Sequence, residues 1–241
     1  MLVILSDLHF SEAQSTQIGE HHFNRNLPPE AYRAYFSEIN QFAKANQVKK
    51  VDLVLAGDTL EISRSGLWLE GRQRPYINNR AVEPGSEVEA IILKILEAIA
   101  DEEKVKETLE AFQNIGDFFD MKVELHMVLG NHDRLANATP KIRKSAREMF
   151  GINGQSDRID NFCVFNDDRG DPFCLVRHGH EYDPTNFSIN IRKMERIPAE
   201  FPLEAYDQAV LGDITTSEFG AALSHLFIDE NGEEAILESK K

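Results

Sequence analysis

The sequence predicts an α/β fold built around a buried sheet, and three observations support this prediction. Short apolar runs at residues 1–5, 51–56 and 123–129 are typical of strands that are covered on both faces. Longer stretches between these runs carry apolar residues at helical spacing. Each run also ends in side chains that bind metals or transfer protons, and ligands in open α/β sheets bind at the carboxyl ends of the strands.

The length and composition fit one soluble domain. The chain has 241 residues, 41% of them hydrophobic, and it contains no internal repeat or clear linker, so we expect a single domain over residues 1–241. No apolar run is long enough to span a bilayer. The first residues, M-L-V-I-L, look like a strand and lack a basic segment or a cleavage site, which predicts a cytoplasmic protein.

The charge of the chain is strongly acidic. Its 26 Lys and Arg face 41 Asp and Glu, a formal net charge of −15, which argues against a broad nucleic-acid surface. A small phosphorylated substrate is still compatible, because bound divalent cations would reverse the local field. Cys163 and Cys174 are too few for a disulfide scaffold, and we interpret them as buried thiols.

The first two predicted strands end in candidate metal ligands. Asp7 and His9 follow the first strand, and side chains two apart point to the same side of an extended backbone. A carboxylate oxygen beside an imidazole nitrogen suits a borderline divalent metal. The second strand ends in Gly57-Asp58-Thr59. Asp58 is either a ligand or the N-cap of a following turn.

Two further strand ends carry the same residue types. The third strand continues into Gly130, Asn131, His132 and Asp133, although Gly-Asn is also an ordinary turn signal. Residues 162–165 and 173–176 predict a hairpin, and its second strand is followed by His178 and His180.

The helices are predicted from apolar spacing and from their start signals. A helix from Pro28-Pro29 to about residue 45 would place Ala31, Tyr35, Ile39 and Phe42 against the core. Further helices are predicted at 86–99, at 101–116, from Thr139-Pro140 to about 149, at 204–211 and at 217–227.

Residues 63–85 are predicted to form a long surface excursion. This stretch is locally basic, with Arg64, Arg72, Arg74 and Arg80 in an otherwise acidic chain. Both a solvated loop and phosphate recognition are compatible with it.

Four strand ends along one sheet edge would form one site. The candidate ligands that would converge there are Asp7, His9, Asp58, Asn131, His178 and His180. That number exceeds what one tetrahedral ion needs and suits two ions about 3.5–4 Å apart. Asp58 is the sole ligand candidate of its strand, so we expect it to bridge the two ions.

The order of these motifs resembles that of the calcineurin-like metallophosphoesterase superfamily, and its bacterial branch in particular. The matching segments are S-D-L-H at 6–9, G-D at 57–58, G-N-H-D at 130–133 and H-G-H-E-Y-D at 178–183. The resemblance implies a four-layer α/β/β/α sandwich. It also implies that Asp7 and His9 bind one metal, that Asp58 bridges, and that Asn131 and His178 bind the second metal. His132 would bind phosphate or donate a proton, and Asp133 would orient its imidazole.

One departure from the family pattern concerns the C-terminus. Family members usually carry a further G-H-x-H, and after Asp183 the chain has only His225. Three explanations stay open. His178-x-His180 supplies these ligands, the chain is a portion of a longer protein, or one metal position is weakened.

The sequence therefore predicts a hydrolase of phosphate mono- or diesters that uses two divalent ions, with manganese, iron or zinc as the first candidates. One alternative is a metal-weakened member of the fold that serves as a binding or scaffold module. Another is a nuclease, which would need the arginines of 64–80 and the basic residues of 141–147 on one face.

Overall fold

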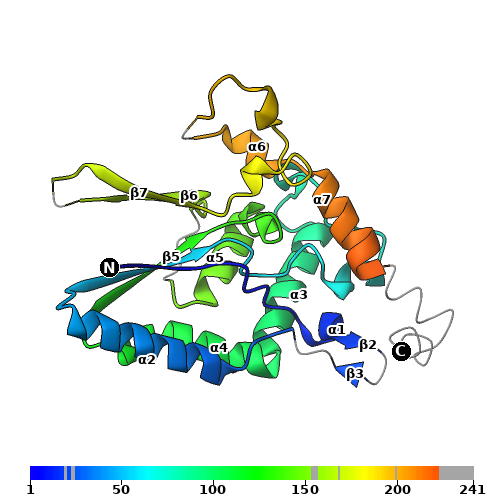
Figure 1. Ribbon diagram of the computed structural model, residues 1–241. Helices are drawn as coiled ribbons and strands as arrows, with labels where there is room; N and C mark the ends of the chain where they lie inside the picture. The colour runs from blue at the N-terminus through cyan, green and yellow to red at the C-terminus, as the bar shows by residue number, and fades with distance from the viewer. Residues whose placement is uncertain (19–20, 23–24, 153–156, 168, 199, 223–241) are drawn as a thin grey trace, which may run out of the picture.

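A three-stranded parallel sheet forms the centre of the protein (Figure 1). The structure is a computed structural model that describes residues 1–18, 21–22, 25–152, 157–167, 169–198 and 200–222. The sheet has the order β1 (Leu2–Leu5), β4 (Lys50–Ala56), β5 (Lys122–Val128). Leu2 pairs with Asp52, and Lys50 pairs with Lys122. The three predicted strands are thus confirmed, and their carboxyl ends lie at one edge.

Alternate residues of β4 face two different layers. Val51, Leu53 and Leu55 belong to the main hydrophobic core, which lies under the helices. Val54 and Ala56 point to the opposite face and pack in a second apolar cluster. Strand side chains alternate between faces, so the apolar run from Leu53 to Ala56 fits a strand covered on both sides.

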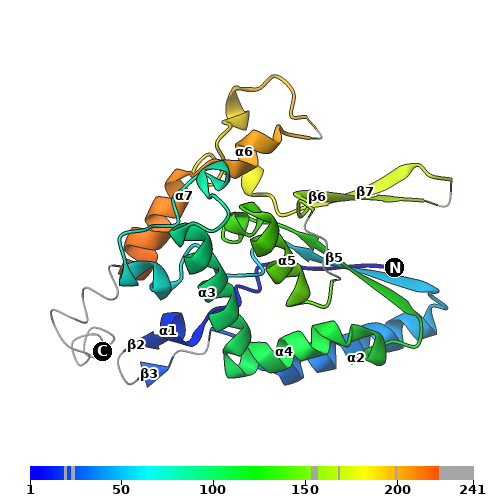
Figure 2. The same cartoon turned by 180° about the vertical axis from the view of Figure 1, so that it is seen from behind.

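Helices α2 (Pro29–Ala45) and α4 (Glu103–Gln113) cover one face of the sheet (Figures 1 and 2). The prediction for the buried stripe of α2 was wrong at three of its four positions. Ile39 is buried, but Ala31 is exposed, and Tyr35 and Phe42 are 39% and 62% exposed. The buried stripe is instead formed by Tyr32, Phe36, Ile39 and Ala43.

Aromatic packing explains this choice of stripe. The Phe36 ring lies 5.2 Å from that of Phe112 in α4, edge to face, and 5.5 Å from that of Phe118. Tyr32 contacts Phe112 in the same way at 5.8 Å. Edge-to-face aromatic pairs stabilise the packing by more than their buried area alone. The helix therefore buries the row that contains Tyr32 and Phe36.

The starts of two other helices agree with the sequence signals. The Ser86 hydroxyl accepts a hydrogen bond from the Glu89 N–H at the start of α3 (Glu87–Asp101). The Thr139 hydroxyl accepts one from the Ile142 N–H at the start of α5 (Pro140–Glu148). Both bonds satisfy donors that a helix start leaves unpaired. The remaining N-terminal elements are α1 (Ala13–Thr16), β2 (Gln17–Ile18) and β3 (His21–His22).

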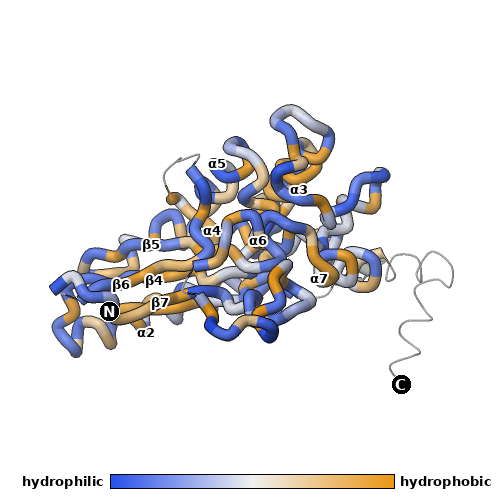
Figure 3. Tube along the Cα trace, turned by 90° about the horizontal axis from the view of Figure 1, so that it is seen from above, coloured by the Kyte–Doolittle hydropathy of each residue, from blue (hydrophilic) through white to orange (hydrophobic). Residues whose placement is uncertain are grey.

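The predicted hairpin is present as β6 (Phe162–Asn166) and β7 (Pro172–Arg177). It is a separate antiparallel sheet, so the expectation that all four strand ends belong to one open sheet was wrong. Its inner residues Cys163, Phe165, Cys174 and Val176 pack on the second face of the parallel sheet, along apolar stretches that Figure 3 shows in β4, β6 and β7. The carboxyl end of β7 still reaches the ligand edge, but from a second layer.

Residues 63–85 were predicted to form a surface excursion, but the start of this stretch is buried. The Trp68 side chain is 1% exposed, and its indole N–H donates to the Ile62 carbonyl at 2.8 Å. Trp68 lies in the 3₁₀ helix η1 (Gly66–Glu70), and a second one, η2 (Asn79–Ala81), follows. The excursion is therefore anchored in the core at its beginning, whereas Arg72 and Arg80 are exposed.

The C-terminal part of the described chain consists of α6 (Leu203–Asp207), α7 (Leu211–Ile214) and the π-helical η7 (Thr215–Ala222). The predicted helix 204–211 is thus two separate helices. Residues 223–227 of the predicted last helix, with His225, lie outside the described residues. The other short 3₁₀ helices are η3 (Ile115–Phe118), η4 (Arg134–Asn137), η5 (His180–Tyr182) and η6 (Ile191–Lys193). In the described ranges no helix has the length and apolar character that crossing a membrane requires.

Candidate metal centre

The loops after β1 and β4 hold the first three candidate ligands in unusual backbone conformations. Asp7, His9 and Asp58 have φ values of 57°, 47° and 49°. Left-handed backbone is uncommon for residues other than glycine and persists where the surrounding structure enforces it, often at functional sites. Here the Asp7 N–H donates to the Gly57 carbonyl and the His9 N–H to the Asp58 carbonyl, at 3.1 and 2.9 Å.

The sequence predicted that Asp7 and His9 point to the same side of an extended backbone, and this prediction was wrong. Asp7 and His9 are not on extended backbone, so strand alternation is not what brings them together. The His9 Nε2 and Asp7 Oδ1 atoms are nevertheless 3.9 Å apart, because the loop curls both side chains toward the edge of the sheet.

Asp7, Asp58 and His178 form the first cluster of potential ligands, with ligand atoms within 4.8 Å of one another. The Asp58 Oδ2 and His178 Nε2 atoms are 3.2 Å apart. On the other side of the ring, Nδ1 of His178 donates to the Ala56 carbonyl at 3.0 Å. Metal-binding histidines are usually held in this way, with one nitrogen fixed by a backbone or carboxylate acceptor and the other facing the metal.

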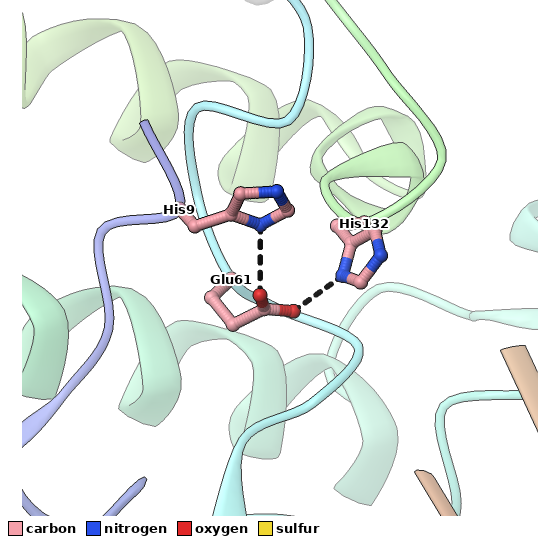
Figure 4. Close-up of side chains that lie close together, drawn as sticks. All are labelled: His9, Glu61 and His132. Carbon is pink, nitrogen blue, oxygen red and sulfur yellow. Dashed lines mark hydrogen bonds and ion pairs between the residues drawn. The ribbon is translucent and has the colours of Figure 1, made fainter. Parts of the chain in front are cut away.

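His9, Glu61 and His132 form the second cluster (Figure 4). The Glu61 carboxylate lies between the two rings, with Oε2 2.8 Å from Nδ1 of His9 and Oε1 2.5 Å from Nδ1 of His132. The Glu61 side chain is buried. It therefore fixes both imidazoles and leaves their Nε2 atoms available.

Glu61 is the site residue that the sequence reasoning missed. Its only signal is its place three residues after Asp58, in the segment that continues from β4. An isolated acidic residue in a mostly apolar stretch, here L-E-I, can mark a buried and partnered carboxylate.

Asp58 lies at the junction of the two clusters. Its Oδ2 atom is 3.9 Å from Nε2 of His9 as well as 3.2 Å from Nε2 of His178, and its Oδ1 atom accepts the His132 N–H at 2.9 Å. Burial raises the pKa of Asp58, but the hydrogen bond from His178 and the nearby imidazole charges outweigh this and lower it to about 2. Asp58 is thus an ionised carboxylate that several groups share.

Two glycines make this convergence sterically feasible. Gly57 has a φ of 89°, and a Cβ there would lie 2.5 Å from Cβ of His178. A Cβ at Gly130 would overlap the Asp58 carboxylate. Both glycines are therefore required by their close approach to the ligands, and Gly57 is required by its positive φ as well.

Asp133 holds two loops together. It is completely buried, and its carboxylate accepts the Gly130 N–H at 2.6 Å and the Thr59 N–H at 2.8 Å. Burial and the charge of Asp58 raise the pKa of Asp133. The expected contact of Asp133 with the His132 ring is not what the structure shows, because the turn directs Asp133 to backbone amides and Glu61 contacts the ring instead.

Asn131 and His180 are the remaining predicted ligands. Asn131 is half-buried in the loop after β5, and its side chain forms no hydrogen bond with the residues that the structure describes. His180 is not part of either cluster. Its ring packs against Phe187 and Tyr206 at 5.8 and 5.9 Å, and burial lowers its pKa to about 4.

The charge state of His132 follows from its neighbours. Burial favours the neutral ring, but the hydrogen bond to Glu61 and the charges of Glu61, Asp58 and Asp133 raise the pKa of His132 to about 9. The same hydrogen bond helps to lower the pKa of Glu61 to about 2 against the effect of burial. In the metal-free protein His132 is therefore an imidazolium at neutral pH, with a proton on Nε2.

The donor set fits divalent cations. It combines imidazole nitrogens and carboxylate oxygens, the ligands of manganese, iron and zinc sites. The side chains of Asp7 and His9 are 59% and 35% exposed, so ions and substrate have access. A third group, Asp52, Glu124 and His126, differs in that the Lys50 ammonium contacts both carboxylates, at 2.8 and 2.6 Å. This group is already neutralised as a salt-bridge network.

An α/β protein with two histidine–carboxylate clusters at the carboxyl ends of parallel strands has the features of a metallohydrolase fold. The family model for calcineurin-like phosphoesterases matches residues 1–237, so the chain belongs to this family. The comparison with curated proteins gives no match, and neither does the comparison with solved structures. The predicted family is thus confirmed, whereas the bacterial branch stays a prediction.

Proposed function

We propose that this protein is a dinuclear-metal-dependent hydrolase of phosphate monoesters or diesters. The observation that carries the proposal is the position of the Asp58 carboxylate, which faces Nε2 of His178 and Nε2 of His9 at once. Two closely spaced cations repel each other, and a negatively charged carboxylate that both cations share reduces this repulsion. Family membership supports the reaction class.

We propose the residues that would hold the metals from the family resemblance of the four motifs, with Asp7, His9, Asp58 and His178 each in one of the two clusters. Asp7 and His9 would bind the first ion, Asp58 would bridge, and Asn131 and His178 would bind the second. We leave His180 out of this set, because its ring is buried against Phe187 and Tyr206. When bound, the two cations would activate water for attack on phosphorus and offset the charge of the phosphoryl oxygens.

His132 would act on the leaving group. Its Nδ1–H is engaged by Glu61, so Nε2–H is the proton that can be donated to the departing oxygen. Glu61 keeps the ring protonated and oriented. Asp133 keeps the loop that carries His132 against the loop that carries Asp58, through its bonds to Gly130 and Thr59.

A small ester fits the charge of the protein better than a nucleic acid does. The net charge is −15, and two of the arginines that a nuclease would need, Arg74 and Arg80, form ion pairs with Glu218 and Glu204. We further propose that residues 1–241 form one domain with the four-layer sandwich of the family. The helix, parallel-sheet and hairpin layers are consistent with that arrangement.

The test is hydrolysis of 4-nitrophenyl phosphate and bis(4-nitrophenyl) phosphate by chelator-treated protein, with Mn²⁺, Zn²⁺ or no metal added back. We expect metal-dependent turnover that Asp58→Asn abolishes. Asp52→Asn is the matched control, because Asp52 belongs to the group that Lys50 neutralises, and it should retain activity. Absence of turnover with either metal, or equal activity of Asp58→Asn and wild type, would refute the proposal.

A further inference from the structure

Two arginines near the candidate metal centre have no partner in the described part of the chain. Arg64 is half-buried, and its Nε atom is inaccessible to solvent without a hydrogen bond. Arg25 is exposed and forms no ion pair or hydrogen bond with any residue that the structure describes.

The backbone fixes Arg25 close to the first metal-binding loop. The neighbouring Asn26 is buried, and its side-chain amide accepts the Ser11 N–H at 3.0 Å and donates to the Ser11 carbonyl at 2.9 Å. Ser11 follows His9 by two residues, and its hydroxyl donates to the His9 carbonyl at 2.9 Å. Arg25 is therefore attached to the loop that carries Asp7 and His9.

The backbone also fixes Arg64, on the side of His132. The N–H of Ser63 donates to the His132 carbonyl at 3.1 Å. The hydroxyl of Ser65 donates to the buried carboxylate of Glu12 at 2.8 Å. The Arg64 side chain also lies beside Gly220 of η7, where an added Cβ would be 3.4 Å from the Arg64 Nε atom.

The charges of these arginines act on each other and on the metal centre. Partial burial lowers the pKa of Arg25, the Arg64 charge lowers it further, and the charges of Glu61 and Glu12 raise it. The rings of His9 and His132, to whose loops the two arginines are attached, have centroids 4.8 Å apart, and the like charges of the two guanidinium groups disfavour each other there. An anion placed between them would relieve this repulsion and gain charge-assisted hydrogen bonds.

Two of the other three arginines of the 63–85 stretch are used differently, and the third, Arg72, is exposed. Arg74 donates to the carbonyls of Trp68, Gly71 and Gln73, and Arg80 pairs with Glu204 and Asp207. These contacts fasten the stretch to itself and to α6. Arg64 is therefore the arginine of this stretch whose surroundings favour a ligand.

We propose that Arg25 and Arg64 bind a second anionic group of the substrate, one that is not the phosphoryl group under attack. The inference rests on the proposed function, because it takes the metal centre as the place of the reacting phosphoryl group. A planar guanidinium binds phosphate and carboxylate oxygens alike, so the shared chemistry is an oxyanion linked to the scissile phosphate by a short connection. The substrate class is a phosphate ester or anhydride with two anionic groups.

The test compares three competitors of 4-nitrophenyl phosphate hydrolysis at a fixed excess of Mn²⁺. Methylphosphonate has one anionic group, methylenebisphosphonate adds a phosphoryl group, and phosphonoacetate adds a carboxylate. For each protein the readout is the ratio of inhibition constants, methylphosphonate over each compound with two anionic groups. Metal chelation by the compounds contributes equally to the ratios of all proteins, so it cancels when the ratio of a variant is divided by that of wild type. The variants are Arg25→Gln and Arg64→Gln, with Arg72→Gln as the control from the same stretch.

We expect wild type and Arg72→Gln to bind at least one compound with two anionic groups more tightly than methylphosphonate, by roughly 10-fold or more. This is the size of the contribution of a charge-assisted hydrogen-bond pair. The preferred compound identifies the second group as phosphoryl or carboxylate. Arg64→Gln and Arg25→Gln should lose most of the preference. No preference in wild type, or a preference that both arginine variants retain, would overturn the inference.

Calorimetry with the same three compounds separates this inference from the proposed function. If the protein hydrolyses no ester but still binds a dianionic compound in an Arg64-dependent manner, the anion site stands and the proposed function fails. If the protein hydrolyses esters and calorimetry shows no Arg64-dependent preference, the proposed function stands and the anion site is refuted.

Discussion

Nε2 of His178 lies 3.2 Å from Oδ2 of Asp58, although the two residues come from different sheets. Asp58 follows the central strand β4 of the parallel sheet, and His178 follows β7 of the hairpin. The stacking of the hairpin on the sheet therefore assembles the centre, and Val176, next to the ligand end of β7, is buried in that interface. We therefore expect metal binding to stabilise the fold through this contact.

Gly57→Ala should weaken both the fold and the metal site. The new methyl group would overlap Cβ of His178, and the φ of 89° is strained for alanine, so we expect a loss of about 2 kcal/mol or more in unfolding free energy. Urea unfolding measures it. Gly71→Ala is the control, because a Cβ there meets nothing within 4 Å and its φ is −136°. Equal stability of the two variants would contradict the assigned role of Gly57.

Glu61→Gln should lower activity by about 10- to 100-fold, the usual effect of removing a residue that orients a ligand. It should also shift the pH profile. The negative charge of Glu61 helps to raise the pKa of His132 to about 9, so its loss lowers that pKa. If His132 must be protonated, the alkaline fall of kcat moves to lower pH in the variant. An alkaline limb at the same pH as in wild type would show that Glu61 does not control His132.

Binding of Mn²⁺ should release protons at neutral pH. Burial alone would lower the pKa of His178, but the hydrogen bond to Asp58 and the Asp58 charge raise it to about 9 in the metal-free protein. A ligand nitrogen must be deprotonated, so binding should release about one proton from His178, and apparent affinity should increase with pH up to that pKa. Calorimetry in two buffers of different ionisation enthalpy measures the release. Affinity that is independent of pH between 6 and 8 would exclude His178 as a ligand.

The ion pair between Arg134 and Asp213, which lies in α7, should contribute strongly to stability. Arg134 is buried, and its guanidinium lies 3.0 Å from the Asp213 carboxylate. Asp213→Ala leaves a buried cation with only neutral partners nearby and with Asp207 acting from a distance, so we expect a loss of about 3 kcal/mol in unfolding free energy. Glu107→Ala, which breaks the exposed pair with Arg33, should cost about 0–1 kcal/mol. Losses of similar size would show that the Arg134 pair is not buried in solution.

The parallel sheet was readable from the sequence because its signal is local. An apolar run such as V-D-L-V-L-A followed by Gly-Asp contains both the strand and the ligand at its end. The caps at Ser86 and Thr139 were readable for the same reason. The side chains of Asp7, Asp58 and His178, each assigned as a ligand from its own strand end, are brought together by the structure.

The features that the sequence did not predict depend on packing between distant segments. The Glu61 carboxylate contacts His9 and His132, which lie in two other loops. Sequence periodicity does not predict such contacts between distant loops. The buried stripe of α2 was misassigned because Tyr35 and Phe42 form a second apolar row, and only contacts with Phe112 select the row of Phe36. The hairpin was predicted correctly. Its position in a separate layer depends on the packing of its inner residues, such as Val176, against Val54 and Val128 of the parallel sheet.

The central claim is that Asp58 is the shared ligand of two divalent ions. Anomalous scattering from crystals of the Mn²⁺-loaded protein tests it most directly. We predict two manganese peaks on either side of the Asp58 carboxylate, one beside Asp7 and His9 and the other beside His178 and Asn131. Crystals without a peak beside Asp58, or with manganese only at Asp52, Glu124 and His126, would contradict the claim.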